Sequence, residues 1–419
     1  MLTLTDRDRA LASGEAGPAA ALAMRIILAV AEANDAPRLI DVTSAHIDSC
    51  LYHGEAGLDF AERLAGEGGK VVIPTTLNVA TLDLLHPHLF RGDTRLQERG
   101  RRLMQAYVAM GGTPTWTCAP YQTAPRPGFG EHIAWAESNA IVFANSVLGA
   151  RTDRYGDFID ICAAITGRVP DAGLHRDENR RARVVFELSD IPDRVLQSAI
   201  LYPVIGHLIG GLAGTAVVAI VGLPGDATED ALKALGAAAA SSGGVALFHA
   251  VGRTPEAPTL AAALGGAEPE AVIRVDLERL VAARAELSTR TSGALTAVSV
   301  GTPHFSLAEF RTLAALLDGR TIHPGVEFYV NTSRDVLAEA AVAGLVDPLR
   351  RAGVEIVTDT CAYITPIIRN TAGVVMTDSG KMAYYAPGNL GVDIAFGTLA
   401  DCVTSAAAGE VRIDPAGWR

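Results

Sequence analysis

The sequence predicts an α/β protein built from layered domains with largely parallel sheets. Apolar, β-branched runs alternate with segments whose apolar residues recur at i, i+3 and i+4, the pattern of strands alternating with amphipathic helices. Small polar and ionisable residues follow the strand-like runs, as in TSAHID, TTLN, TCAPY, GTPHFS, VNTS and TDTCAY. Ligands bind at the carboxyl ends of strands in open α/β sheets, so we expect these segments to converge on one pocket.

The elements can be placed in order along the chain. Five runs predict strands, at 38–43, 70–76, 295–301, 326–332 and 354–360. Three segments predict helices, at 58–68, 307–317 and 334–353. The 21 uncharged residues of 204–224 are long enough to span a bilayer, but their glycines and final proline favour a buried helix followed by an internal strand. We therefore expect no membrane segment.

A shift in composition suggests where the chain divides. Ala, Gly and Ser dominate residues 226–269, and turn-forming residues interrupt this stretch. We interpret it as a connection between an α/β domain over 1–225 and a second α/β domain over 270–419.

Composition and charge limit the class of partner. The 419 residues are 49% hydrophobic and 20% charged, as in an ordinary globular protein with a large core. Acidic residues outnumber basic ones by 47 to 35, giving a net charge of -12, which disfavours nucleic acid and anionic membranes and favours a small-molecule ligand. The amino terminus carries acids and lacks the layout of a signal peptide, so we expect a cytoplasmic protein.

The five cysteines are an odd number, widely spaced and without a CxxC pair, so each thiol is either a core residue or a metal ligand. Cys118 and Cys361 each follow a strand-like run and a threonine, whose groups can donate hydrogen bonds to a thiolate. Cys402 is expected early in a helix, where the amide dipoles would lower its pKa. Cys162 has the surroundings of a core thiol, and Cys50 is undecided.

Six strings together carry a resemblance to a known family: residues 45–64, 70–87, 117–122, 130–158, 358–364 and 379–403. They include AHIDSCLYHG, TCAPYQ, GARTDRYGDF and TDTCAYI. Across nearly its whole length the chain resembles the large component of aconitase X. The resemblance implies an aconitase-superfamily fold and a dehydratase.

The resemblance also implies a cofactor and a substrate. The family uses an iron–sulfur centre or a mononuclear iron held by three cysteines, which here would be Cys118, Cys361 and Cys402. A [2Fe-2S] cluster is the expected form, with [4Fe-4S] or mononuclear iron as alternatives. Three protein ligands would leave one iron position open for the hydroxyl of the substrate. Of the family's two activities, dehydration of cis-3-hydroxy-L-proline is expected rather than that of mevalonate 5-phosphate, because the sequence lacks a strong phosphate-binding motif. Dehydration of another hydroxy acid stays open as a further alternative.

Further site candidates follow the strand-like runs. Hydroxyl, imidazole and amide groups suited to fixing a small carboxylate come from Ser44, His46, Asp48, Thr75, Thr76 and Asn78. Tyr121, close to Cys118, is a candidate that could equally be a packing aromatic. Arg151 could clamp a carboxylate or pair with Asp153 or Asp157. Lys381, expected in a loop, is a candidate for binding the substrate carboxylate or tuning the catalytic base.

The resemblance raises one requirement that this sequence does not meet by itself. The family needs a smaller swivelling domain that supplies a serine as the base, and only 17 residues follow Cys402. We expect a separate small subunit and an obligate hetero-oligomer. Two other classes stay open: a metal-independent or zinc enzyme with merely buried cysteines, and a non-catalytic, metabolite-binding paralogue.

Overall fold

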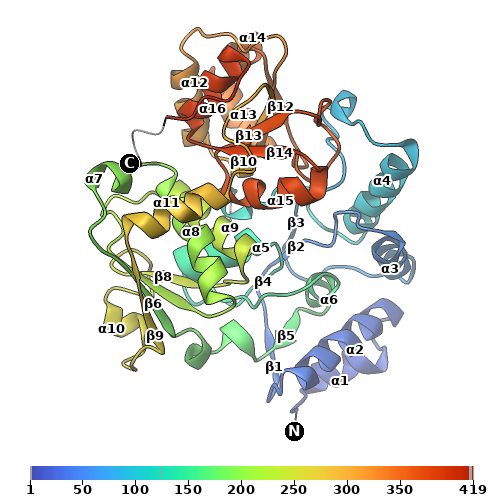
Figure 1. The fold of residues 1–419 in the computed structure, drawn as a ribbon. Coiled ribbons are helices and arrows are strands. Elements are labelled where there is room, and N and C mark those ends of the chain that lie inside the picture. The colour runs from blue at the N-terminus through green and yellow to red at the C-terminus, as the bar shows by residue number, and fades with distance from the viewer. Residues whose placement is uncertain (1, 124, 415–417, 419) are drawn as a thin grey trace. The chain divides into compact units, whose positions relative to one another are not determined.

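The computed structural model describes residues 2–123, 125–414 and 418. The chain forms two compact units: unit 1 is Met1–Leu82 with Asp93–Arg181, and unit 2 is Asp83–Gly92 with Ala182–Arg419. Helices surround mainly parallel sheets in each unit (Figure 1). The predicted α/β class with largely parallel sheets is confirmed.

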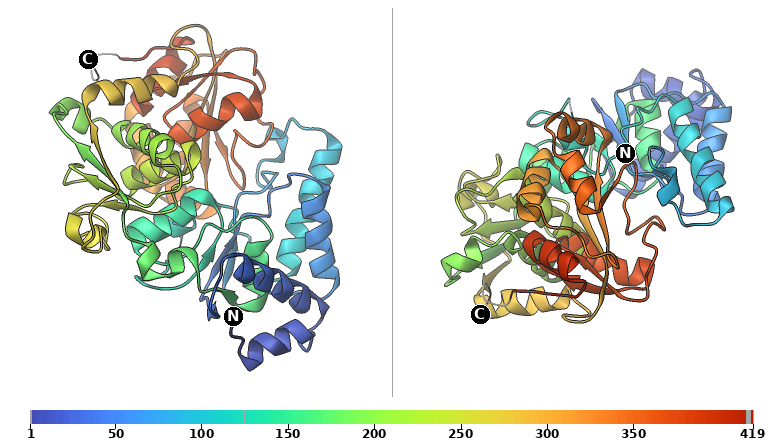
Figure 2. Two further views of the ribbon diagram at one scale, coloured as in Figure 1. Left: turned by 60° about the horizontal axis from the view of Figure 1, so that its bottom comes forward. Right: turned by 90° about the horizontal axis from the view of Figure 1, so that it is seen from above.

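Unit 1 contains a small parallel sheet of order β3-β2-β4 and an antiparallel pair, β1 with β5. Its strands are β1 (Leu39–Asp41), β2 (Ala45–Ile47), β3 (Thr75–Leu77), β4 (Ala134–Trp135) and β5 (Arg168–Pro170). Its α-helices are α1 (Asp6–Ser13), α2 (Pro18–Ala33), α3 (Glu55–Gly66), α4 (Thr94–Ala109), α5 (Ser138–Phe143) and α6 (Ile159–Thr166). Shorter helical turns are η2 (Pro120–Gln122), η3 (Ala144–Leu148), η4 (Gly173–His175) and η5 (Asp177–Asn179). The helices α3 and α4 lie side by side (Figure 2).

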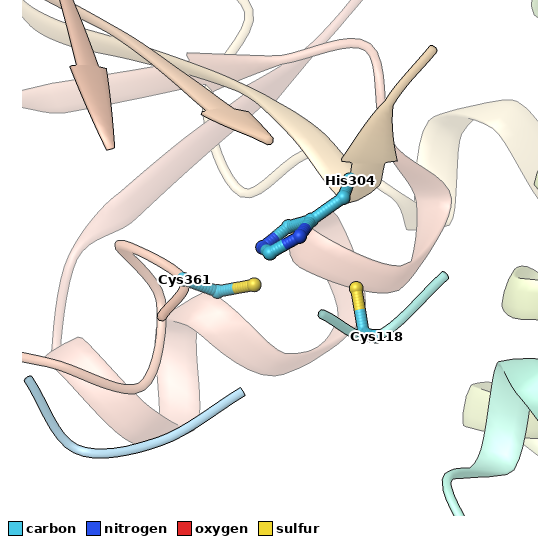
Figure 3. Close-up of side chains that lie close together, drawn as sticks. All are labelled: Cys118, His304 and Cys361. Carbon is cyan, nitrogen blue, oxygen red and sulfur yellow. The ribbon is translucent and has the colours of Figure 1, made fainter. Parts of the chain in front are cut away.

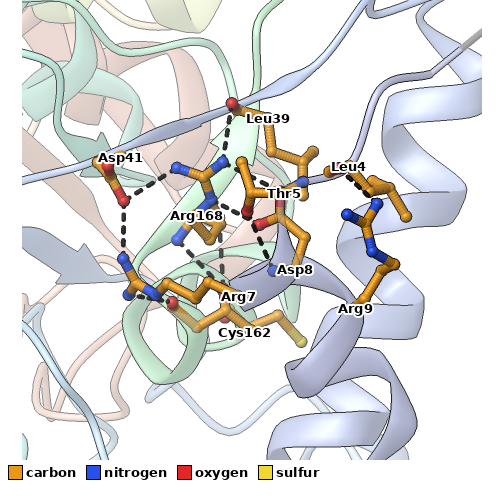
Figure 4. A network of polar contacts seen from close by, with 10 residues as sticks. Leu4, Thr5, Arg7, Asp8, Arg9, Leu39, Asp41, Cys162 and Arg168 are labelled. Carbon is orange, nitrogen blue, oxygen red and sulfur yellow. Dashed lines mark hydrogen bonds and ion pairs between the residues drawn. The ribbon is translucent and has the colours of Figure 1, made fainter.

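A buried ion pair fastens the first helix of unit 1 to its antiparallel strands. Thr5 and Asp8 form a capping box at the start of α1, and Arg168 of β5 donates to both carboxylate oxygens of Asp8, at 2.8 and 3.2 Å (Figure 4). Arg168 also donates to the Leu39 carbonyl at 2.9 Å and pairs with Asp41. Burial acts to raise the pKa of Asp8, but these hydrogen bonds outweigh it, so the pKa is lowered and the carboxylate stays charged.

Unit 2 contains two parallel sheets, of order β8-β7-β6-β9 and β12-β11-β10-β13-β14. The first sheet is built from β6 (Val184–Leu188), β7 (Val218–Val221), β8 (Phe248–Ala250) and β9 (Ala271–Val275). Its helices are α7 (Asp193–Leu196), α8 (Leu201–Ala213), α9 (Glu229–Ser242), α10 (Leu260–Ala263) and α11 (Leu277–Glu286). The second sheet is built from β10 (Leu295–Phe305), β11 (Glu327–Thr332), β12 (Val354–Val357), β13 (Val374–Thr377) and β14 (Asp393–Phe396). Its helices are η1 (Pro87–Leu89), α12 (Leu307–Leu317), α13 (Arg334–Val342), α14 (Val346–Ala352), α15 (Gly380–Leu390) and α16 (Leu399–Ala408).

The second sheet of unit 2 follows directly from its sequence. β10 is buried along almost its whole length, as the apolar runs of a covered parallel sheet require. α12 begins with a capping box in which the Ser306 and Glu309 side chains bond each other's backbone N–H groups. The predicted helix 307–317 is therefore confirmed. The predicted helix 334–353 is instead two helices, because Gly344 adopts a left-handed conformation between α13 and α14.

Residues 226–269, expected as a connection, lie inside unit 2 and form α9, β8 and α10. Their small residues serve packing: α8 and α9 lie side by side (Figure 1), and a Cβ on Gly206 of α8 would come within 2.2 Å of the Leu235 carbonyl oxygen of α9. Ala and Gly on both helices allow this close approach, so the composition indicates a tight helix pair.

The uncharged stretch 204–224 folds as α8 followed by β7, as expected. Within the described ranges, no single helix is both long and apolar enough to cross a membrane, although the bent pair α1 and α2 passes by length and composition.

Candidate functional site

Two neighbouring strands of unit 1 bring four of the predicted site residues together. His46 lies on β2 and Thr76 on β3, in direct register, and His46 Nδ1 is 2.8 Å from the Thr76 hydroxyl. Just beyond the strands, the Asn78 amide donates to the Asp48 carboxylate. His46 Nε2 and Asn78 Oδ1 are buried without a hydrogen-bond partner in the described part of the chain. Hydrogen bonding to Asn78 and to the Thr117 backbone nevertheless acts to raise the pKa of His46, so His46 and Asn78 belong to one buried polar cluster.

The protonation of this group is unusual. Burial, and then the negative charges of Glu137 and Asp157, raise the pKa of Asp48 to about 7. Burial also lowers the pKa of His46 to about 4, against the opposing effect of Glu137. At neutral pH His46 is therefore an uncharged hydrogen-bond donor or acceptor, and Asp48 exchanges a proton near neutrality.

The turn after β2 is fixed by a third acid, Asp160 at the start of α6. Asp160 accepts hydrogen bonds from the backbone N–H groups of Asp48 and Ser49 and from the Ser49 hydroxyl, at 2.8 to 3.1 Å. Tyr107 donates to the Ser49 hydroxyl at 2.9 Å. Burial raises the pKa of Asp160 to about 6. This network sets the position of Asp48 relative to Asn78.

Other predicted residues of unit 1 have structural partners. Tyr121 stacks on Phe143 with ring centroids 3.7 Å apart, and its hydroxyl donates to Asn139 at 3.1 Å, which is the packing role considered for it. Arg151 pairs with Asp177 and donates to the His175 carbonyl, so neither Asp153 nor Asp157 is its partner. The Thr75 hydroxyl donates to the Ile73 carbonyl. Ser44 is half-buried in the loop before β2.

Unit 2 contributes a pair of possible metal ligands. His304 lies at the end of β10 and Cys361 in the loop after β12, and their ligand atoms lie within 4.8 Å of each other (Figure 3). Both residues are buried. His304 Nε2 is 3.1 Å from the Thr360 carbonyl oxygen, which holds the proton on Nε2 and leaves Nδ1 with the lone pair that a metal requires. The sequence GTPHFS is a predicted strand end, but His304 is not among the predicted site residues.

The loop that carries Cys361 is held by charged and polar groups. Asp83 accepts from the Thr358 N–H and hydroxyl at 2.8 and 2.9 Å and from His86 at 2.9 Å. Although burial opposes it, hydrogen bonding from His86 and Thr358 lowers the pKa of Asp83. Arg334 donates two hydrogen bonds of 2.6 Å to Asp359, whose backbone is left-handed. The loop is therefore preorganised to present the Cys361 thiol.

The loop is also tied to the neighbouring strand. Asn331 of β11 accepts from the Ala362 N–H at 2.9 Å and donates to the Val300 carbonyl at 2.7 Å. Gly301 follows Val300, and a Cβ there would lie 2.2 Å from the Asn331 carbonyl oxygen. Only glycine fits at this contact, and it allows β10 to bend before His304.

The remaining cysteines differ in surroundings. Cys118 is buried in the loop before η2 of unit 1, and its carbonyl accepts from Asn139 at 2.8 Å. Cys402 lies in α16 among the apolar side chains of the unit 2 core. Its pKa is raised by burial and by the charge of Asp378, so the expected lowering by the helix dipole is wrong: desolvation outweighs the dipole. Cys162 is a core thiol of α6, and Cys50 donates to the Ile47 and Asn78 carbonyls.

Lys381 was expected in a loop but is the second residue of α15, where it is buried. Ser379 caps this helix by accepting from the Met382 N–H. Gly380 precedes the lysine, and a Cβ on Gly380 would lie 3.1 Å from the Cβ atoms of Ala238 and Pro203. Close packing again explains the small residue.

Unit 2 also contains a cavity of about 720 Å³. It is lined by the segments that follow β6, β7, β10 and β13. Its charged residues are mostly acids: Asp193, Asp226, Asp230, Lys233, Glu309 and Asp378.

Profiles of the first, second and third domains of aconitase X match residues 1–178, 182–285 and 295–408. The chain belongs to the aconitase X family. The same fold is found in the crystal structure of Thermococcus kodakaraensis aconitase X in its holo form, with a TM-score of 0.87, 32% identity, and coverage of 96% of this chain and 100% of that one.

Curated relatives of this aconitase X chain are dehydratases. It is 46% identical to cis-3-hydroxy-L-proline dehydratase of Pseudomonas aeruginosa, over 98% of this chain and 70% of that protein. It is 44% identical to the enzyme of the same name from Hypocrea jecorina, over 97% and 69%. It is 37% identical to the phosphomevalonate dehydratase large subunit of Methanothermobacter thermautotrophicus, over 91% and 93%.

Proposed function

We propose that this chain is the large catalytic subunit of a hydro-lyase that dehydrates cis-3-hydroxy-L-proline to 1-pyrroline-2-carboxylate. The observation that carries the proposal is the 46% identity to a dehydratase of that name over almost the whole chain, against 37% for the phosphomevalonate enzyme. The reaction removes the hydroxyl from C3 and the proton from C2, and the resulting enamine tautomerises to the cyclic imine. Mevalonate 5-phosphate is the alternative substrate.

The donor set fits an iron–sulfur centre. Cys118 and Cys361 supply buried thiols, and His304 lies beside Cys361 with its tautomer fixed by a backbone carbonyl. The third ligand is proposed to be either Cys402, as the resemblance implies, or His304. A [2Fe-2S] form is proposed, with [4Fe-4S] and mononuclear iron as the alternatives. When bound, such a centre supplies a Lewis acid for the departing hydroxyl oxygen.

The side chains at the strand ends of unit 1 are proposed to bind the substrate. Neutral His46, Thr76 and Asn78 offer hydrogen bonds to a carboxylate or hydroxyl. Asp48, with its pKa near 7, can give or take a proton at neutral pH. Ser44, Thr75, Tyr121 and Arg151 remain predictions with weaker support, since the last three have structural partners.

Two further roles are proposed, one for Lys381 and one for a partner subunit that carries the catalytic base. We propose that Lys381, at the positive end of α15, binds the substrate carboxylate or tunes the base. The main base is proposed to belong to a separate small subunit, in a hetero-oligomer, because the archaeal relatives are named large subunits and the chain matches 93% of one of them. A cytoplasmic location is also proposed, consistent with five free thiols.

The test is to co-express the chain with its small subunit, purify anaerobically, and assay both substrates while measuring iron and acid-labile sulfide. We expect the wild-type complex to turn over cis-3-hydroxy-L-proline. The Cys118→Ala and Cys361→Ala variants should lose iron and the electron paramagnetic resonance signal of the reduced protein, and their kcat should fall by at least ~1,000-fold. His304→Ala and Cys402→Ala identify the third ligand. Cys162→Ala, a core thiol of α6, is the matched control and should keep its iron.

Each outcome has a clear meaning. Wild-type complex that holds neither iron nor sulfide would remove the cluster, and turnover of mevalonate 5-phosphate alone would replace the substrate. Full turnover by the isolated chain would remove the proposed small subunit.

A further inference from the structure

The cavity of unit 2 lies where its second sheet reverses its strand order, at the ends of β10 and β13. In the second sheet the chain runs from β10 to β11 and β12 on one side, and β13 and β14 lie on the other, so the reversal falls between β10 and β13. In the first sheet the reversal falls between β6 and β9. Residues after β10, β13, β6 and β7 line the cavity. Ligands of open α/β sheets bind at such reversal points, and about 720 Å³ lies within the usual volume range of ligand pockets.

The one lysine that lines the cavity has no proton left for a ligand. Lys233 is buried, and its ammonium contacts Asp230 at 2.8 Å, Glu309 at 2.5 Å and the His304 carbonyl at 3.4 Å. An ammonium has three protons, and these three oxygens account for all of them. Lys233 therefore neutralises two acids of the wall and cannot receive an anionic ligand.

Asp378 lines the cavity just after β13, and no other described residue forms a hydrogen bond or ion pair with its side chain. It is half-buried, and the positive charge of Lys233 and its own backbone N–H stabilise its carboxylate against burial and the charge of Glu309. Thr302 lines the cavity at the end of the neighbouring strand β10; it is 4% exposed, and its hydroxyl is buried without a hydrogen-bond partner in the described part of the chain. A carboxylate that forms no ion pair and a buried hydroxyl on adjacent strand ends suit a ligand that donates hydrogen bonds and carries positive charge.

The cavity adjoins the possible metal ligands along the chain. Thr302 and Pro303 line it, and the next residue, His304, lies beside Cys361. The cavity and His304 thus share the end of strand β10. The exposed Asp193 and Asp226 at its edge add negative charge, which repels a phosphorylated ligand.

We propose that Asp378, assisted by Thr302, binds the ring ammonium of the amino-acid substrate in this cavity and so selects hydroxyproline over a phosphorylated hydroxy acid. The inference rests on the proposed function, and Asp378 is a specificity-determining residue for it. cis-3-Hydroxy-L-proline carries a secondary ammonium with two N–H donors. Mevalonate 5-phosphate carries no ammonium and has a negatively charged phosphate.

The experiment is steady-state kinetics of the complete complex with wild type, Asp378→Asn, Thr302→Val and the control Asp347→Asn. Asp378→Asn should raise KM for hydroxyproline by about 10- to 100-fold with a smaller effect on kcat, since hydrogen bonds to charged groups are worth that much. Asp347→Asn makes the same chemical change at an exposed position of unit 2 outside the cavity and should change KM less than about twofold. An unchanged KM for Asp378→Asn would overturn the inference.

A second measurement separates recognition of the ammonium from a general loss of structure. cis-2-Hydroxycyclopentane-1-carboxylate has the same ring size without the nitrogen, and we would measure it as an inhibitor. Wild type should bind the nitrogen-containing ring more tightly, and Asp378→Asn should lose that preference. Equal weakening of both ligands would show that Asp378 is structural and would contradict the proposal.

The two hypotheses fail differently. If the wild-type complex does not dehydrate hydroxyproline, the proposed function fails. Ammonium recognition by the cavity is then tested separately, by comparing the affinities of L-proline and cyclopentanecarboxylate in calorimetry. A preference for L-proline that disappears in Asp378→Asn supports ammonium recognition, and no preference overturns it.

Discussion

Buried acids near the strand ends of the two units behave in opposite ways. Asp83 in unit 2 receives hydrogen bonds from His86 and from both groups of Thr358, so its pKa is lowered and its charge is fixed. Asp48 in unit 1 receives the Asn78 amide, and burial with two acidic neighbours raises its pKa to about 7. The difference lies in the number of donors that each carboxylate receives.

The comparison suggests a division of work between the units. In unit 2 hydrogen bonds and ion pairs hold a loop, and that loop presents the soft ligand Cys361 beside His304. Asp83 is the acid held charged there, whereas burial raises the pKa of Asp359 and raises that of Asp378 to about 7. Unit 1 keeps groups whose protonation is easily changed or whose polar atoms lack partners, as at Asp48 and His46. A dehydratase needs both kinds of site, since one group must withdraw electrons from the leaving oxygen and others must move protons.

The largest expected effect tests the ion pair that holds the Cys361 loop of unit 2. Arg334→Ala removes both guanidinium hydrogen bonds to Asp359, whose side chain is fully buried, and leaves the Leu84 N–H, at 3.0 Å, as its donor. We expect a loss of about 3 kcal/mol in the free energy of unfolding, measured by urea denaturation. Arg290→Ala breaks an exposed pair with Asp393 and should cost less than about 1 kcal/mol. Equal losses in the two variants would show that the Arg334 pair does not hold the loop.

The second effect tests the proton-exchanging acid of unit 1. Because folding raises the pKa of Asp48 from 3.8 to about 7, the native state binds the proton more tightly than the unfolded chain. Its stabilising contribution is complete below pH ~4 and is lost as the pH rises through 7. The stability of wild type relative to Asp48→Asn should therefore fall by on the order of 3 kcal/mol between pH 4 and 8.

Unfolding of both proteins at several pH values measures this difference. Asp59→Asn, at an exposed position of α3, provides the control and should track wild type across the range. A pH-independent difference between wild type and Asp48→Asn would show that Asp48 stays ionised, which would end the contrast with Asp83.

The parts of the fold that were predictable are those that depend on periodicity. The helix at 307–317 and the strands near 326–332 and 354–360 follow from local apolar patterns and caps. Residues 226–269 were misread because Ala and Gly have the same composition in a linker and in a close helix pair. The approaches of Gly206 to Leu235 and of Gly210 to Ala239 distinguish the two cases, and these contacts join residues far apart in sequence.

The candidate site was predictable to a similar extent. Parallel strands place His46 with Thr76 and Asp48 with Asn78, which the strand-end rule anticipated. His304 could have been found, because GTPHFS is a strand end of the same kind as TDTCAY. The burial of Cys402 in a core and the pairing of Arg151 with Asp177 could not be predicted. The position of a residue in a helix and the order of charges along the chain do not show which neighbours its side chain contacts.

The smallest expected effect concerns the helix pair that supports unit 2. Gly206→Ala places a methyl group 2.2 Å from a backbone carbonyl of α9, so the helices must separate, at a cost of about 1–3 kcal/mol in unfolding free energy. Gly211→Ala on the same helix has nothing within 4 Å and should be neutral or stabilise by up to about 1 kcal/mol through helix propensity. Opposite signs in urea denaturation would show that packing, rather than flexibility, explains the glycines. If both substitutions stabilise the protein, α8 and α9 do not pack closely at Gly206, and residues 226–269 are better described as a connection.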